Sequence, residues 1–324
     1  MKRKNKENIL VTGGAGFIGR WVVARLLGDT SHRVLALDNF SNSSPANLDE
    51  FRREPRLEVV RGNVHSPKTI EKVFTRFRPV ICIHLAAQII VQNSIDDPEA
   101  TFRSDVEGTF RLLEACRERN TCLAFMSTCM VYDFAAAGKG IAETHPTLSR
   151  SPYAASKLAG EEFAVSYHHA YGLPTTVMRP FNTYGPFQKS TGEGGVVAIF
   201  IKKQLDGEDL LIYGTGRQTR DFLYVEDCAD FILRAAFSPK TNGRVLNACS
   251  GGDITINRLA RLVVDTAPRK TASRIRRVKH IHPQSEIQKL LGNCDLAKKL
   301  LGWKPATSLE DGIAKTREWL IKTS

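Results

Sequence analysis

The amino-acid sequence predicts an α/β fold, a doubly wound parallel sheet with a smaller C-terminal lobe. Three observations support this prediction. Short apolar segments alternate with amphipathic segments through the first half of the 324 residues. A glycine-rich turn follows the first apolar segment, and from about Asn182 the pattern gives way to glycines, prolines and mixed turns. We therefore expect two units: residues 1–180 joined by a return of residues 221–248, and a lobe over residues 181–324.

Six apolar segments of the first part have the length and composition of buried strands. They cover residues 7–13, 32–38, 57–63, 81–87, 121–128 and 173–182. Helices are expected over residues 17–27, 105–118 and 151–172. Because crossovers between parallel strands are right-handed, this alternation places helices on both faces of one sheet. Beyond it we expect isolated strands at 209–214 and 222–227, then the segment 296–303 and a closing helix at 308–321.

The composition limits the class of protein. No apolar run approaches the roughly 20 residues of a membrane-spanning helix, and the basic N-terminus leads directly into a strand, without the apolar region of a signal peptide. The 7 cysteines are scattered and include no CxxC pair, which favours free thiols in a reducing compartment over disulfides or a zinc site. We therefore expect a soluble, cytoplasmic protein that binds no metal.

The net charge of +12 is compatible with two classes of partner, nucleic acid and small anionic ligands such as a diphosphate. The basic residues are spread along the chain, apart from the N-terminal tail and the stretch from Arg274 to Lys279. Aromatic residues do not alternate with them as on an RNA-binding surface. A solvated surface with an anion-attracting cleft is favoured, and we expect no nucleic-acid partner.

The turn between the first strand and the first helix indicates a dinucleotide site. Gly13, Gly16 and Gly19 have the spacing GxxGxxG, and glycine permits a tight turn and close approach of backbone N–H groups to a pyrophosphate. Such a turn alone can also be a plain strand–helix connection. Asp38 strengthens the prediction, because a carboxylate at the end of the next strand can bind ribose hydroxyls and repels a 2′-phosphate. Asn39 follows it, so NAD is favoured over NADP.

A tyrosine and a lysine four residues apart are candidates for catalysis. Tyr153 and Lys157 would share one face of the helix expected over residues 151–172. An ammonium near a phenol lowers the phenol pKa from about 10, which would make Tyr153 a general base for a hydroxyl whose carbon gives up hydride. Thr128, next to Ser127, adds a hydroxyl at the carboxyl edge of the sheet, where ligands bind. Singly, the pair can arise by chance and Thr128 can be a strand cap.

Together these segments resemble the extended short-chain dehydrogenase/reductase family, and within it the NAD-dependent nucleotide-sugar epimerase and dehydratase branch. The resemblance covers nearly the whole chain and rests on TGGAGFIG, LDNFSNS, HLAAQ, MSTCMVY, YAASK, RPFNTYGP, RQTRDFLYVED and LLGWKP. LDNFSNS is most similar to UDP-glucose/UDP-galactose 4-epimerases. The resemblance implies that the first unit is a Rossmann domain that binds NAD and that the C-terminal lobe binds a nucleotide-sugar.

The resemblance also implies the site residues. For NAD they are Gly13, Gly16, Phe17, Ile18, Gly19, Asp38, Asn39, Asn42, Ser43, Asn63, Val64, Leu85, Ala86, Ala87 and Lys157. For the nucleotide-sugar they are Thr128, Cys129, Met130, Tyr153, Asn182, Arg220 and Glu286. Tyr153 would take the proton of the sugar hydroxyl while C4 gives hydride to NAD, with Lys157 on the nicotinamide ribose and Thr128 against the reacting oxygen. For three of these residues a simpler role stays open. Asn63 can be a turn residue, Arg220 can form an ion pair, and Glu286 can cap a turn.

The two residues after Thr128 bear on which reaction occurs. Relatives that remove water or carbon dioxide from the sugar typically have Glu at the second position, whereas this chain has Cys129 and Met130. Met130 has no titratable proton, and a buried thiol more often packs than reacts. We therefore expect a 4-epimerase of a UDP-hexose. The alternatives are a 4,6- or 5,6-dehydratase and, from another class, a non-catalytic NAD-binding scaffold.

Two further expectations concern specificity and assembly. Leu290 falls where related epimerases carry the residue that gates the sugar pocket, and its small size predicts that N-acetylhexosamines are accepted. Members of the branch commonly dimerise through the Tyr–Lys helix and the helix before it, so we expect a homodimer. The seam between the two protomers would include six residues that could equally well pack in the core of one protomer, Leu112, Leu113, Leu158, Ala159, Phe163 and Val165.

Overall fold

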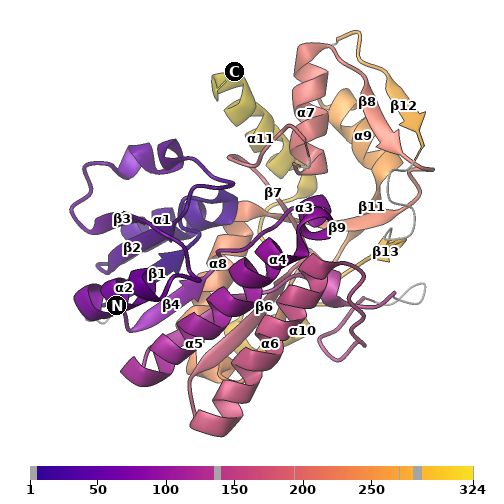
Figure 1. The fold of residues 1–324 in the computed structure, drawn as a ribbon. Helices are drawn as coiled ribbons and strands as arrows, with labels where there is room; N and C mark the ends of the chain where they lie inside the picture. The colour runs from indigo at the N-terminus through magenta and orange to yellow at the C-terminus, as the bar shows by residue number, and fades with distance from the viewer. Residues whose placement is uncertain (1–5, 135–139, 193, 270, 280–286, 324) are drawn as a thin grey trace.

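A seven-stranded parallel sheet forms the frame of the larger part of the molecule (Figure 1). The structure is a computed structural model that describes residues 6–134, 140–192, 194–269, 271–279 and 287–323. The strands are β1 (Asn8–Thr12), β2 (Arg33–Asp38), β3 (Leu57–Arg61), β4 (Ile81–His84), β5 (Cys122–Met126), β6 (Thr175–Pro180) and β10 (Arg244–Ala248). Their spatial order is β10-β6-β5-β4-β1-β2-β3, and every neighbouring pair is parallel.

Helices cover both faces of this sheet. One face carries α1 (Phe17–Asp29), α8 (Val225–Ala236) and α10 (Asp295–Leu301), and the other carries α2 (Pro67–Phe77), α5 (Gly108–Arg119) and α6 (Pro152–Tyr171). Successive residues of a strand point to opposite faces, so that Ile9 and Val11 pack in the first core cluster and Leu10 in the second. The predicted doubly wound α/β fold is confirmed.

Short helical segments shape the loops at the carboxyl edge of the sheet. After β4 the chain forms α3 (Val91–Asp96), α4 (Pro98–Thr101) and a π-helical turn, η2 (Phe102–Glu107), that runs directly into α5. Three 3₁₀ turns lie elsewhere, η1 (Pro45–Phe51), η3 (Cys129–Val131) and η4 (Pro239–Thr241). The helix expected over residues 105–118 therefore begins inside a π-helical turn, and its regular part starts at Gly108.

The smaller lobe has its own sheet and core, at the upper right of Figure 1. Strand β9 (Thr219–Tyr224) pairs with β7 (Asn182–Tyr184), β11 (Asp253–Thr255) and β13 (Lys289–Leu290), and β8 (Leu210–Tyr213) pairs with β12 (Ile275–Val278). The helices are α7 (Val196–Asp206), α9 (Ile256–Asp265) and α11 (Leu309–Thr323). Their apolar faces share one core cluster that includes Phe200, Leu259 and Ile313.

Beyond residue 182, three helices of the structure were not predicted from the sequence, and one predicted strand lies at other residues. Helices α7, α8 and α9 were not expected, and the strand predicted at 222–227 ends at Tyr224, where α8 begins. Glu226 and Asp227 lie in the first turn of α8, where acidic side chains stabilise the helix dipole. The apolar side chains Cys228, Phe231, Ile232 and Ala235 then recur at helical spacing and are fully buried.

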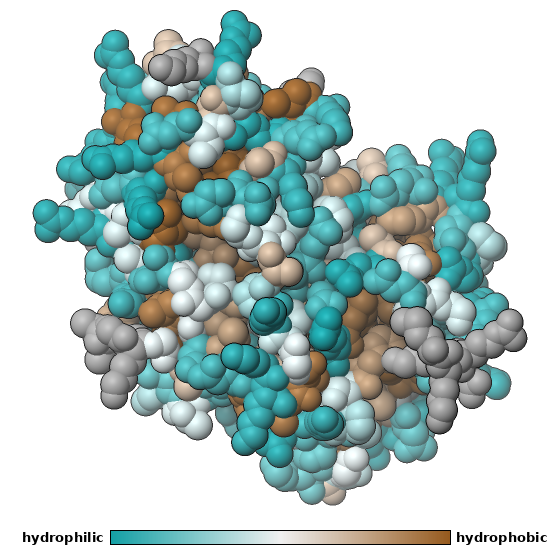
Figure 2. Space-filling view, turned by 180° about the vertical axis from the view of Figure 1, so that it is seen from behind, coloured by the Kyte–Doolittle hydropathy of each residue, from teal (hydrophilic) through white to brown (hydrophobic). Residues whose placement is uncertain are grey.

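On the side opposite to the view of Figure 1, the described residues at the surface are mostly hydrophilic. Figure 2 shows mostly hydrophilic residues there, with hydrophobic residues visible in separate groups between them. Within the part of the chain that the structure describes, no helix is long and apolar enough to span a membrane.

Candidate active site

The glycine turn between β1 and α1 requires glycine at two of its positions. Gly13 has φ +67°, and a Cβ there would lie 2.8 Å from the backbone nitrogen of Ala86. A Cβ at Gly19 would overlap the carbonyl oxygen of Gly13. Gly16 precedes α1 and no side chain caps the helix there, so the N–H groups of the first helical residues, Phe17 and Ile18, face out of the helix end. This turn fits the pyrophosphate of a dinucleotide, which needs close backbone approach and N–H donors.

Asp38 lies beside the glycine turn and is held by three donors. Its Oδ2 accepts a hydrogen bond from Ala15 N at 3.0 Å, and its Oδ1 accepts from Phe40 N at 2.8 Å and Ser43 Oγ at 2.9 Å. The side chain is only 7% exposed. Ser43 therefore orients the carboxylate that was predicted to bind the adenosine ribose.

Two asparagines link the ends of β2 and β3. Asn39 donates through Nδ2 to Asn63 Oδ1 at 2.7 Å, so these two predicted NAD residues lie side by side. Val64, the next residue, is buried in the core beside Gly108. Asn42 accepts a hydrogen bond from Lys189 Nζ, which comes from the loop after β7. This contact between a predicted NAD residue and the lobe was not predicted from the sequence.

The residues that follow β4 also lie at the carboxyl edge of the large sheet. Leu85 N donates to Thr12 O at 3.1 Å and Ala86 N to Thr12 Oγ1 at 3.2 Å, which places residues 85–87, including Ala87, next to the glycine turn. His84 is fully buried between two hydroxyls, with Nδ1 2.7 Å from Thr12 Oγ1 and Nε2 3.1 Å from Thr109 Oγ1. Burial, and then the charge of Lys157, lower the pKa of His84 to about 3, so its imidazole is neutral at working pH.

The Tyr–Lys helix begins at a regular cap. Ser151 Oγ accepts from Ala154 N at 3.2 Å and Pro152 is the first helical residue, so α6 starts just before Tyr153. Lys157 is 3% exposed and its Nζ donates to Met126 O at 2.9 Å, at the carboxyl end of β5. Burial lowers the pKa of Lys157, and the carboxylates of Asp105 and Glu161 oppose that shift.

Thr128 meets Tyr153 at this edge. Thr128 follows β5, is 8% exposed, and accepts a hydrogen bond from Met130 N at 3.2 Å. Its hydroxyl lies near the Tyr153 phenol and opposes the rise that burial causes in the pKa of that phenol. Thr128, Tyr153 and Lys157 therefore gather where β5 and α6 meet.

The expected effect of Lys157 on the pKa of Tyr153 is wrong. The Tyr153 phenol was expected to have a lowered pKa because of Lys157. Instead, burial raises the pKa of Tyr153, and the nearby Asp105 carboxylate and Cys129 raise it further. The ammonium of Lys157 donates to the backbone carbonyl of Met126, and Lys157 is not among the groups that shift the pKa of Tyr153.

Cys129 and Met130 form the 3₁₀ turn η3 after Thr128. Cys129 is 3% exposed, and burial raises its pKa to about 12, with Arg220 opposing and Asp221 supporting that shift. The thiol is thus protonated at neutral pH, able to donate a proton but not to accept one. Met130 packs against the small apolar cluster of Cys129, Tyr132, Ile141, Phe181, Cys249, Ile287 and Leu290.

The lobe supplies two more of the predicted substrate-binding residues, Arg220 and Asn182. Arg220 on β9 donates through Nη1 to Ile287 O at 2.6 Å and Thr219 O at 2.9 Å, and Asn182 donates to Asp221 O at 3.1 Å. Leu290 is fully buried in the cluster that contains Cys129. Glu286 lies outside the described residues.

Asp221 is a residue that sequence reasoning missed. It is fully buried and accepts four hydrogen bonds, from Ser250 N at 2.7 Å, Ser250 Oγ at 2.6 Å, Gly251 N at 3.0 Å and Gly292 N at 3.1 Å. The carboxylate thereby ties β9 to the ends of β10 and β13, and it fixes the strand that carries Arg220. Asp221 can be read in the motif RQTRDFLYVED, but the residues that donate hydrogen bonds to its carboxylate lie far away in the chain, so its role could not be predicted from the sequence.

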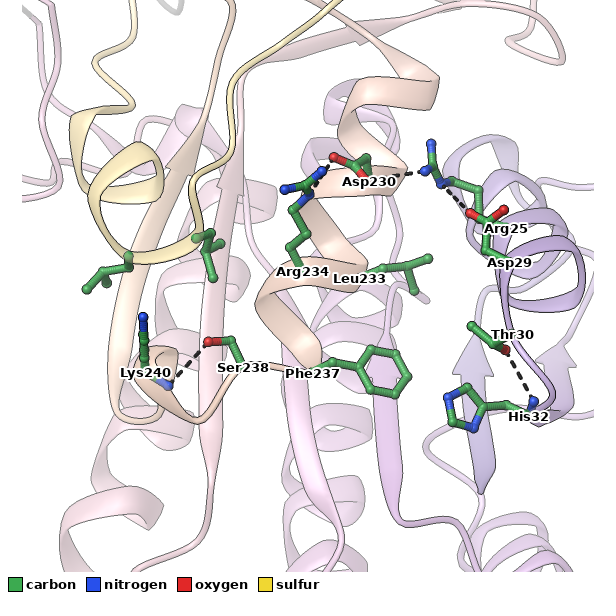
Figure 3. Close-up of a pocket in the computed structure, with 12 residues that line it drawn as sticks. Arg25, Asp29, Thr30, His32, Asp230, Leu233, Arg234, Phe237, Ser238 and Lys240 are labelled. Carbon is green, nitrogen blue, oxygen red and sulfur yellow. Dashed lines mark hydrogen bonds and ion pairs between the residues drawn. The ribbon is translucent and has the colours of Figure 1, made fainter. Parts of the chain in front are cut away.

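A hollow of about 390 Å³ lies at the opposite edge of the large sheet, between α1, α8 and α10 (Figure 3). Asp230 stands there between two arginines, 3.2 Å from Arg25 Nη2 and 2.8 Å from Arg234 Nε. Phe237 and His32 stack on its wall. None of the predicted site residues lines this hollow.

The chain is similar in sequence and structure to known proteins over nearly its whole length. The chain matches the model of the NAD dependent epimerase/dehydratase family over residues 9–249. It is 34% identical to the UDP-glucose 4-epimerase of Mycolicibacterium smegmatis, over 97% of this chain and 99% of that protein. It is 32% identical to a dTDP-glucose 4,6-dehydratase of Neisseria gonorrhoeae, over 99% and 97% of the two chains.

A solved structure, that of Pal from Bacillus thuringiensis, superposes with a TM-score of 0.94 at 54% identity and covers 98% of this chain and 100% of its own. The likeness thus extends over both the sheet and the lobe. The chain belongs to the NAD-dependent epimerase/dehydratase family, and NAD is its cofactor.

Proposed function

We propose that the protein is a 4-epimerase of a UDP-hexose that works through a 4-keto sugar. One observation carries this proposal: Thr128 and Tyr153 lie close together near the carboxyl end of β5, while the two residues after Thr128 provide no carboxylate. The relative named UDP-glucose 4-epimerase supports the choice of substrate. We assign NAD to residues 1–180 with 221–248, and the nucleotide-sugar to the lobe over 181–324.

In this mechanism NAD, when bound, would supply the hydride acceptor for C4 of the sugar. Tyr153 takes the proton of the C4 hydroxyl, and Thr128 holds the oxygen between them. Lys157 keeps the nicotinamide ribose in place, while Arg220 and Asn182 hold the diphosphate, for which a guanidinium is well suited. After the 4-keto sugar turns over in the site, Tyr153 returns the proton as hydride comes back to the opposite face.

The test is a panel of UDP-, dTDP-, GDP- and CDP-sugars with product analysis by mass and NMR. The proposal predicts that UDP-glucose and UDP-galactose interconvert with no change in mass. Run in D₂O, the reaction leaves no deuterium on the ring, because the hydrogen removed from C4 is the one returned. A product lighter by one water, or deuterium at C5, overturns it.

The second candidate is a nucleotide-sugar dehydratase, which one observation favours. Cys129 is a protonated thiol close to Tyr153 and can donate a proton to a leaving hydroxyl. A chain that is 32% identical is named a dTDP-glucose 4,6-dehydratase. Cys129→Ala separates the two reactions. A 4-epimerase keeps its rate within about tenfold, or about 1.4 kcal/mol of barrier, whereas a dehydratase that uses the thiol as acid loses about 100-fold or more.

We also propose that UDP-N-acetylhexosamines are substrates. Leu290 is smaller than an aromatic residue and packs in the same cluster as Cys129, a predicted substrate-binding residue. Leu290→Tyr adds bulk that the packed cluster has no room for, so the ring is pushed toward the sugar. The expected result is selective loss of the N-acetyl substrate. Equal losses on both substrates, with an unchanged melting temperature, contradict this specificity.

A further inference from the structure

A short segment that begins with β7 reaches from the lobe to the predicted NAD site. It covers residues 182–189 and is called the bridging arm. At its start, Asn182 Nδ2 donates to Asp221 O on β9 at 3.1 Å. At its end, Lys189 Nζ donates to Asn42 Oδ1. Because Asn182 was predicted to hold the diphosphate and Asn42 to bind NAD, one continuous segment connects the two predicted ligand sites.

The bridging arm is braced along its length. Its first three residues, Asn182–Tyr184, pair with β9 in parallel. After the turn at Gly185, the side chain of Gln188 folds back, and its Nε2 donates to Thr183 O at 2.9 Å. The backbone nitrogen of Gln188 donates to Gly185 O at 3.3 Å. These bonds tie the far end of the arm to β7, so a displacement of β7 is expected to move that end as well.

The middle of the bridging arm is held against α1 in a strained backbone conformation. Phe187 has φ +70°, in the left-handed region that residues other than glycine rarely adopt. Its ring centre lies 3.9 Å from the guanidinium of Arg20 and 5.0 Å from the ring centre of Trp319. Next to it, Trp21 Nε1 donates to Pro186 O at 3.2 Å. Such strain persists only where surrounding contacts impose it, and here those contacts come from α1 and α11.

Arg20 connects the arm to the loop between β2 and β3. Its side chain is buried, and its Nε donates to Asn47 O at 3.3 Å. Asn47 Nδ2 donates to Ala15 O at 2.8 Å, within the glycine turn. Asn42 and Asn47 both belong to this loop. The bridging arm therefore holds the loop at two points, directly through Asn42 and through Arg20 at Asn47.

We propose that the bridging arm couples the two ligand sites, so that a nucleoside diphosphate bound in the lobe slows the release of NAD. A diphosphate held by Asn182 fixes β7, and β7 keeps Phe187 and Lys189 on their partners. The loop that they hold follows Asp38, which was predicted to bind the adenosine ribose. By linkage, NAD strengthens binding of the diphosphate by the same factor. This inference rests on the proposed function, which assigns the nucleotide-sugar to the lobe.

The test measures how fast bound NAD exchanges in the full-length protein. The protein is loaded with ¹⁴C-labelled NAD, unlabelled NAD is added in excess, and the label that stays bound is followed in time. The measurement is made without UDP and with saturating UDP. In the unaltered protein UDP is expected to slow the exchange by about fivefold or more, the lower end of coupling between linked sites.

Two variants remove the contacts of the bridging arm and leave Asn182 in place. Phe187→Ala deletes the ring that lies on Arg20. Lys189→Met removes the ammonium that reaches Asn42, and since Lys189 is exposed, the variant is expected to fold normally. In both variants UDP is expected to change the exchange rate by less than about twofold. Lys322→Met, at an exposed site on α11, is the control and is expected to keep the full UDP effect.

A merely structural role of the arm would speed NAD release by the same factor with and without UDP, and the UDP effect would stay at full size. That result in Lys189→Met overturns the proposal, as does an exchange rate that UDP leaves unchanged in the unaltered protein. Calorimetric titration with UDP separates the two proposals. UDP that binds without slowing exchange contradicts the coupling alone, whereas a protein that binds no UDP contradicts the proposed function as well.

Discussion

In the proposed mechanism, three side chains at the carboxyl edge of the sheet carry out the chemistry. Thr128 lies two residues after the end of β5, and Tyr153 and Lys157 lie in the first two turns of α6, so the hydroxyl, the phenol and the ammonium are held next to the parallel sheet. Hydride transfer needs the sugar oxygen, its carbon and the nicotinamide held in one geometry, which rigid elements provide better than loops. The first prediction therefore concerns which of these groups moves the proton.

Tyr153→Phe removes the phenolic oxygen and nothing else. A positioned general base contributes about 10²–10⁴-fold to rate, so kcat is expected to fall by that factor. The affinity for NAD is expected to stay the same, because the glycine turn and Asp38 are untouched. Steady-state turnover and calorimetric NAD titration measure the two quantities.

Tyr171→Phe is the matched control, since Tyr171 lies at the exposed end of the same helix. Its turnover is expected to equal that of the unaltered protein. A Tyr153→Phe protein that retained full turnover would show that the proton leaves by another route.

At the scale of elements, the glycine turn packs so closely against neighbouring backbone that Gly13 and Gly19 have no room for a side chain. The turn brings Gly13 against Ala86 and Gly19 against Gly13, so that α1 starts directly above the end of β1. This closeness is what lets the helix N-terminus meet a pyrophosphate.

Gly19→Ala tests this arrangement. The added methyl would overlap the Gly13 carbonyl, so the turn has to open and NAD affinity is expected to fall by at least about tenfold, or 1.4 kcal/mol. Gly28→Ala lies in the same helix with no atom within 4 Å of the new Cβ. It is expected to keep NAD affinity and to stabilise the fold by roughly 0.5–1 kcal/mol. Equal NAD affinity in the two variants would contradict the role of the turn.

The elements also show how far sequence reasoning reaches. The strands, the glycine turn and α6 were predictable, because period, length and end residues are local signals. Helices α7, α8 and α9 were missed because glycine- and proline-rich connections around them obscured their apolar spacing. Asp105, His84 and Asp221 carry no local signal. Each is defined by burial against segments far away in sequence, such as Ser250 and Gly292 for Asp221, and only the folded chain brings those together.

At the scale of the whole molecule, the two parts are joined across α1. Trp21 Nε1 donates to Pro186 O at 3.2 Å, in the loop after β7. The guanidinium of Arg20 lies 3.9 Å from the ring centre of Phe187, which in turn packs against Trp319 of α11. Together with the contact between Lys189 and Asn42, these groups link the adenosine side of the NAD site to the lobe.

We propose a homodimer formed through α5 and α6. Of the residues expected in its seam, Leu112 and Leu113 are fully buried in the core, so they cannot contribute. Phe163 remains 38% exposed and packs edge-on against Phe110, which is 39% exposed on α5, with ring centres 5.9 Å apart. An exposed aromatic pair on adjacent helices is suited to burial against a second copy.

Phe163→Glu is expected to convert the dimer to a monomer in light scattering coupled to size exclusion, because a charge would be buried at the seam. Ile321→Glu, at a 54% exposed apolar site on α11, serves as the control and is expected to stay dimeric. A monomeric unaltered protein, or a dimeric Phe163→Glu, contradicts this seam.

The path of one hydrogen atom tests the whole account most directly. UDP-glucose carrying deuterium at C4 is incubated with the protein and NAD in ordinary water, and the product is analysed by NMR. Removal and return of that atom at the same carbon predicts UDP-galactose with the deuterium still at C4. Deuterium found on another carbon of the sugar, or lost to the solvent, would contradict a 4-epimerase.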